Sequence, residues 1–123
     1  MNTILLVKVK AAILANPEHF DMSLWACGTA ACICGWTAKL AGEYGTLQEG
    51  LTADGEPCFD AVQLGARLLK ISYEQASDLF LRSWPSDLYL EYENAGEDKA
   101  KRAQVAAAVI DDFIAHDGNW WGR

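Results

Sequence analysis

The chain has 123 residues, of which 51% are hydrophobic and 22% charged, a composition typical of a folded globular domain and unlike that of a disordered chain. Seventeen acidic residues outnumber ten Lys and Arg, and the resulting net charge of −7 repels phosphate backbones and anionic membrane surfaces. The charge therefore excludes nucleic acid and membranes as partners, and it suits a basic protein partner or simple solubility.

The beginning of the sequence does not have the pattern of an export signal. The apolar run from Ile4 to Val7 has no basic residue before it and is interrupted by Lys8 and Lys10. No stretch approaches the roughly 20 apolar residues that a membrane-spanning helix needs. We therefore expect a cytoplasmic protein, whose four cysteines stay reduced and serve by default as small buried residues.

Apolar residues recur at helical spacing along almost the whole chain, and the alternation typical of strands is nearly absent. The first predicted helix spans residues 3–15 and has one apolar face, formed by Leu5, Val9, Ala12 and Ile13. The second spans residues 29–41, with Thr29 as its N-cap and Gly42 as its terminator. This second helix consists mostly of small residues, so we expect it to be central and buried on most sides.

Four further helices follow a polar, turn-rich segment at residues 43–56. One of them begins with a capping box, in which Ser72 is the N-cap and Gln75 stands three residues later. The expected ranges are Pro57 to Lys70, Ser72 to beyond Phe80, Ser86 to Tyr92, and Glu97 to His116. The sequence thus predicts an all-α fold: a compact single domain over residues 1–123, with about six helices around a central helix of small residues.

Two cysteines, Cys27 and Cys32, lie near the predicted start of the second helix. A helix N-terminus stabilises a thiolate and lowers the thiol pKa, so either residue is a candidate nucleophile of a hydrolase or transferase. The partners that the chain offers are His116 or His19 as the base and Asp112 or Asn119 as the orienting group. Asp112 and His116 are four residues apart and share a helix face. However, a histidine at a helix end is already explained by the helix dipole, so we favour a structural role for these cysteines.

Four cysteines and two histidines are also enough ligands for a zinc ion. Cys32 and Cys34 are two residues apart on a predicted helix, so their side chains diverge and cannot both bind one ion. A zinc-stabilised module built on Cys27, Cys32, Cys58 and a histidine is therefore an alternative. Our expectation is that the protein has no metal and no cofactor.

The chain contains five tryptophans, a residue type that is enriched at binding hot spots. We take Trp84, Trp120 and Trp121 as candidate binding residues. Trp120 and Trp121 follow the last predicted helix, where they either fold back onto the core or form an exposed apolar surface. We favour folding back, because a chain end with large apolar groups is usually held down.

Several short segments of the chain are distinctive when taken together: Cys27 to Ile33 with Gly35-Trp36, Leu68-Leu69, Glu74 to Ala76, Leu79-Phe80 and Trp84-Pro85. With these segments the chain resembles a group of small uncharacterised proteins encoded by bacteria and their phages. Cys34 departs from the small non-thiol residue expected there. The resemblance implies a bacterial or phage origin and transfers no catalytic residue.

These observations predict a non-enzymatic, acidic protein-interaction module. This prediction rests on the acidity of the chain, the number of tryptophans and the lack of a complete set of catalytic residues. The resemblance adds the expectation of a phage or mobile-element accessory protein that binds and modulates a host protein.

Overall fold

A computed structural model describes residues 1–23, 31–45 and 61–120 of the chain. These residues form six α-helices and one short 3-10 helix, with a single isolated bridge in place of any strand. The helices are α1 (Thr3–Ala15), α2 (Ile33–Leu40), α4 (Ala61–Leu69), α5 (Tyr73–Phe80), α6 (Ser86–Asn94) and α7 (Lys99–Ala115), and the 3-10 helix is η1 (Pro17–His19). The expected all-α bundle is confirmed.

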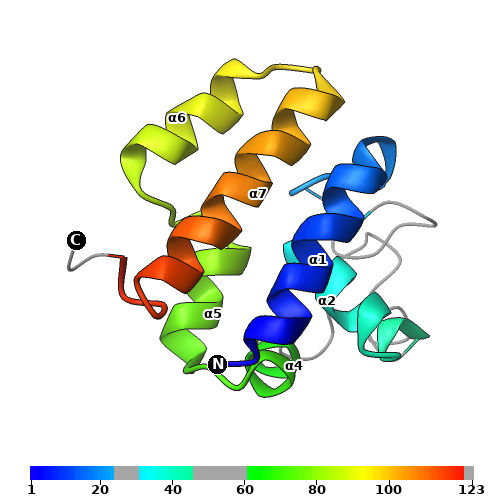
Figure 1. The fold of residues 1–123 in the computed structure, drawn as a ribbon, viewed down its shortest axis with the longest axis vertical. Coiled ribbons are helices and arrows are strands. Elements are labelled where there is room, and N and C mark those ends of the chain that lie inside the picture. Colours follow the sequence, from blue (N-terminus) through cyan, green and yellow to red (C-terminus); the bar gives the residue numbers. More distant parts are fainter. Residues whose placement is uncertain (24–30, 46–60, 121–123) are drawn as a thin grey trace.

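The first and last helices, α1 and α7, pack side by side (Figure 1) and run in opposite directions. Helix α1 also contacts α2, which in turn packs on α4, and α4 packs on α5. The remaining helix, α6, packs chiefly on α7. The largest fully buried side chains come from both ends of the chain and from its middle: Leu6, Val9, Ile13, Phe20, Ile33, Leu69, Leu79, Val109, Ile110, Phe113 and Trp120.

The second helix is buried on most sides, as its small residues predict, because all of its residues from Ile33 to Ala38 are buried. It begins later than expected, at Ile33, because the backbone of Ala31 is engaged elsewhere. The Ala31 N–H donates to the His19 carbonyl at 3.0 Å, and the Ala31 carbonyl accepts from the Asp21 N–H at 3.0 Å. Thr29, the expected N-cap, lies outside the described residues.

The end of α2 matches the prediction. Gly42 has a φ of +79°, and the N–H of Glu43 donates to the Ala38 carbonyl at 2.7 Å. This is the bond that closes a helix through a left-handed residue, which glycine adopts at the lowest cost.

Helix α5 begins with the predicted capping box. The Ser72 hydroxyl accepts from the Gln75 N–H at 3.1 Å, and the Gln75 side-chain oxygen accepts from the Ser72 N–H at 3.0 Å. Helix α5 also lies unusually close to α4, because a Cβ atom added at Gly65 would overlap the Phe80 ring. The expected start of the preceding helix at Pro57 lies outside the described residues.

The last two helices differ from the predicted ranges only at their ends. Pro85 rather than Ser86 occupies the N-cap position of α6. Helix α7 begins at Lys99 because the Asp98 carboxylate caps it, accepting from the Lys101 N–H at 3.0 Å. None of the helices in the described ranges has the length and apolarity needed to cross a membrane.

Candidate functional site

Cys32 does lie at the amino end of a helix, where it occupies the N-cap position of α2. Its side chain is only 2% exposed, and this burial raises its pKa to about 11, although backbone N–H groups of Gly35 and Cys34 act in the opposite direction. The expected lowering of the pKa is therefore wrong for Cys32, because the loss of hydration outweighs the helix N-terminus. At neutral pH this group is a protonated thiol.

Cys34 is buried in the first turn of the same helix. Its thiol donates a weak hydrogen bond to the Ala61 carbonyl at 3.5 Å, and burial raises its pKa well above the usual value. Both cysteines thus behave as small core residues that connect α2 to its neighbours. Cys27 and Cys58 lie outside the described residues.

The expected pairing of Asp112 with His116 is present at the carboxyl end of α7. His116 Nδ1 lies 3.6 Å from Asp112 Oδ1 and 2.9 Å from the Asp112 carbonyl oxygen. Asn119 lies beyond them, and its N–H donates to the His116 carbonyl. The carboxyl end of α7 lies away from the start of α2, where Cys32 is located (Figure 1).

The second candidate base, His19, lies nearer to Cys32 in the fold. Its carbonyl accepts from the Ala31 N–H and, at 3.1 Å, from the Trp36 indole N–H. Its ring Nε2 lies 3.6 Å from Glu18 Oε1. The described residues therefore contain a carboxylate–histidine pair and a buried thiol, but they do not bring Cys32 and His116 together.

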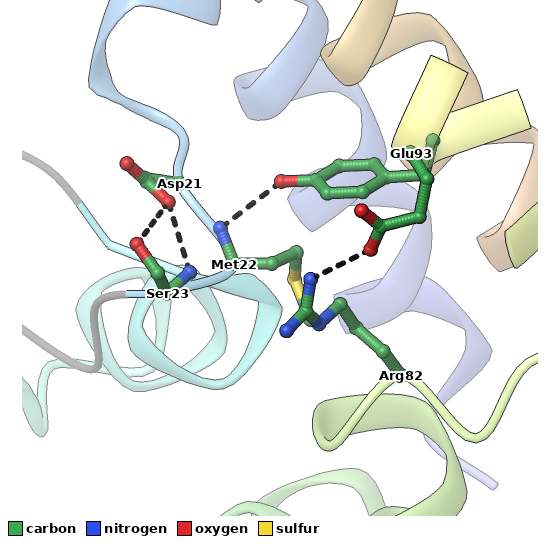
Figure 2. Close-up of polar contacts among 6 residues, drawn as sticks. Asp21, Met22, Ser23, Arg82 and Glu93 are labelled. Atoms are coloured by element: carbon green, nitrogen blue, oxygen red, sulfur yellow. Dashed lines mark hydrogen bonds and ion pairs between the residues drawn. The ribbon is translucent and has the colours of Figure 1, made fainter. Parts of the chain in front are cut away.

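A polar cluster fixes the segment that follows η1 (Figure 2). The N–H of Met22 donates to the Tyr92 hydroxyl at 3.3 Å, and the Asp21 carboxylate accepts from the N–H and hydroxyl of Ser23 at 2.9 and 2.6 Å. Beside them, Arg82 on the chain after α5 forms an ion pair of 3.2 Å with Glu93 of α6. The cluster thus ties three distant parts of the chain together.

The ionisation states in this cluster suit a structural role. Partial burial acts to raise the pKa of Asp21, but the Ser23 hydrogen bonds and the positive charges of Arg102 and Lys99 lower it below its usual value. Burial raises the pKa of Tyr92, so its hydroxyl stays protonated at neutral pH. Tyr92 also packs edge-on against Trp84, with ring centroids 5.3 Å apart. Such groups anchor the backbone of residues 21–23.

The two described candidate binding tryptophans are in the core. Trp84 is 3% exposed, and its indole N–H donates to the Leu79 carbonyl at 2.9 Å. Trp120 is 1% exposed and packs edge-on against Phe113 at 5.1 Å, which confirms that it folds back. A partner cannot contact either ring without opening the core, and Trp121 lies outside the described residues.

The surface carries other large apolar side chains that the sequence reasoning missed. On α1 they are Ile4, Val7 and Leu14, which together with the exposed Ala11 form what we call the α1 face. The end of α2 adds Leu40, and a second group around α6 comprises Leu81, Tyr89 and Leu90. The sequence did contain a signal for the α1 face. Four consecutive apolar residues, Ile4 to Val7, cannot all lie on one buried stripe of a helix, so some of them must be exposed.

Metal ligation finds no support in the part of the chain that the structure describes. No group of three or more His, Cys, Asp or Glu residues there is arranged to hold an ion.

Comparison with protein-family models, curated proteins and solved structures finds no match for this chain. Its function must therefore be inferred from its own residues and their geometry.

Proposed function

We propose that this chain is a non-enzymatic, acidic protein-interaction module that works in the bacterial cytoplasm. The observation that supports this most directly is the distribution of apolar side chains. Ile4 is 73% exposed, and Leu90, on a different helix, is 57% exposed, whereas both described cysteines and the described candidates Trp84 and Trp120 are buried. Large exposed apolar side chains that gather on a small domain are typical of protein-binding surfaces.

The chemistry of the described residues is consistent with binding rather than catalysis. Cys32, the described candidate nucleophile, is a buried thiol with a raised pKa, and such cysteines are inert. With the resemblance to small bacterial and phage proteins, these features support an accessory factor that binds and modulates a host protein.

The test is an affinity pull-down from bacterial lysate with the purified full chain, with the zinc content measured on the same preparation. We expect one saturable partner, bound reversibly and without stoichiometric metal. The matched variants Ile4→Asp and Leu90→Asp each place a carboxylate on an exposed apolar surface, and one of them should release the partner. Rapid alkylation of a cysteine at neutral pH with no partner would instead indicate a thiol enzyme, and stoichiometric zinc would indicate a metal-stabilised module.

A further inference from the structure

Helix α1 has apolar residues on two sides. Its inner side, with Leu6, Val9 and Ile13 completely buried, packs on α7 and α2. The outer side is the α1 face, whose residues Ile4, Val7, Ala11 and Leu14 follow one another at separations of three, four and three residues. This is the spacing by which one helix packs along another. The described part of the molecule fills only the inner side.

A groove continues the α1 face toward α2 and α4. It has a volume of about 270 Å³ and is lined by Asn2, Ile4, Leu5, Lys8, Leu40, Ala41 and Leu68. Ile4 belongs both to the groove and to the α1 face, and Leu40 is 41% exposed at the groove's other wall. A large side chain entering this groove would be anchored beside the helix-spaced stripe, as occurs when an amphipathic helix binds to a groove.

The charge of this surface is opposite to that of the whole chain. The net charge is −7, yet the only charged residues of α1 are Lys8 and Lys10. Lys10 is paired with Asp111 of α7 at 2.8 Å, whereas Lys8 has no ion pair with any residue in the described ranges and borders the groove. The surface therefore favours a partner that carries a carboxylate at this point.

The same charges argue against a second copy of this chain as the occupant. Lys8 and Lys10 flank the α1 face on its two edges, near the middle of its length, so two α1 helices packed together would place lysines close to lysines in either relative direction. Helix α1 has no acidic residue to compensate them, and Asp111 of α7 pairs with Lys10 and not with Lys8. Like charges at an interface cost binding energy, and both copies would also bring a net negative charge.

From these observations we propose that the α1 face and its groove bind an amphipathic helix of a partner protein. The apolar residues of that helix, spaced at three and four, pack against Ile4, Val7 and Leu14, and one of its carboxylates lies beside Lys8. This inference rests on the proposed function, for which it names the surface and the class of partner.

The test uses the full chain labelled with ¹⁵N and two synthetic helical peptides as probes. Both peptides carry the same leucine stripe at heptad spacing, but one is flanked by Glu and the other by Lys. We expect the Glu peptide to shift resonances of α1 and of the groove residues. It should bind about fivefold more tightly than the Lys peptide, since one exposed ion pair is exchanged for one repulsion.

Three variants sharpen the result. Ile4→Asp should abolish binding of both peptides, and Lys8→Glu should reverse the preference so that the Lys peptide binds more tightly. The matched control is Leu90→Asp, which alters a similarly exposed leucine on α6 and should leave binding unchanged. Because all three positions are on the surface, the thermal unfolding midpoint of each variant serves to verify the fold.

Several outcomes would overturn the inference. They are no binding of either peptide, equal affinity for both, or shifts confined to α6 and sensitive only to Leu90→Asp. Dimerisation of the free chain that Ile4→Asp abolishes would identify a second copy as the occupant instead. If a lysate partner is released by Leu90→Asp alone, this inference fails while the proposed function stands. If the Glu peptide binds as expected but no cellular partner exists, the proposed function fails.

Discussion

Helices α1 and α7 pack against each other, yet they use their outer surfaces differently. The outward residues of α7 include Lys101, Gln104 and Asp111, the ordinary polar surface of a helix in a globular protein. The outward residues of α1 include Ile4 and Val7. Since the described fold covers only the inner side of α1, packing within the described residues does not explain the apolar outer side, and the binding role proposed above would account for it.

The largest expected effect is on the free energy of unfolding, and it compares a side chain of the core with an apolar side chain of the α1 face. Phe113→Ala removes a fully buried ring that contacts Trp120, and we expect it to lower the free energy of unfolding by about 3–5 kcal/mol. Leu14→Ala, on the outer side of α1, should change it by no more than about 0.5 kcal/mol. Urea denaturation of both variants measures the difference. A large loss for Leu14→Ala would mean that the α1 face is part of the core.

The rate at which the Cys32 thiol reacts in the native protein tests whether this end of α2 is buried. A pKa of about 11 for Cys32 leaves roughly one group in ten thousand ionised at pH 7, so alkylation should be about a hundredfold slower than for an unperturbed thiol. The rate should rise as pH increases toward 11, because the thiolate is the reacting form. Peptide mapping after iodoacetamide treatment measures the rate at Cys32, with the urea-unfolded chain as the fast reference. Fast native labelling would contradict the burial.

A substitution at the contact between α4 and α5 should have an effect of intermediate size on the free energy of unfolding. Gly65→Ala introduces a Cβ that overlaps the Phe80 ring, and we expect a loss of about 1–3 kcal/mol from overpacking. Gly45→Ala is the matched control, since no atom lies within 4 Å of its added Cβ. Thermal unfolding of both variants provides the comparison, and equal midpoints would show that the two helices separate easily.

The smallest effect concerns a helix end. Ser72→Ala removes the hydroxyl that accepts from the Gln75 N–H, which should cost about 1 kcal/mol of stability. Ser86 also lies at the start of a helix, but Pro85 holds the N-cap position there, so Ser86→Ala should have little effect. Chemical denaturation of the two variants distinguishes a capping role from a general preference for serine.

Local chemistry made much of the fold predictable. The capping box at Ser72 and the glycine end of α2 at Gly42 depend on residues that are close in sequence, and both are confirmed. The predicted start of α2 at Thr29 was wrong, because the backbone of Ala31 forms hydrogen bonds with His19 and Asp21. These two residues belong to another part of the chain, and helical periodicity does not reveal such a contact.

The candidate site was less predictable for the same reason. The sequence correctly places Cys32 at a helix N-terminus and Asp112 beside His116, but the pKa of Cys32 depends on how much of the core surrounds it. The α1 face was missed because the first helix was assigned a single apolar side. Which of two apolar sides is covered depends on the position of α7, about a hundred residues later in the chain.

The pairing of α1 with α7 has a consequence for how the protein is made. Lys10 and Asp111 are 101 residues apart, so α1 leaves the ribosome long before α7, which covers part of its inner side, has been synthesised. During that interval the part of the inner side that α7 covers is exposed together with the α1 face. We therefore expect the nascent chain to bind holdase chaperones through α1 until translation reaches the end of α7.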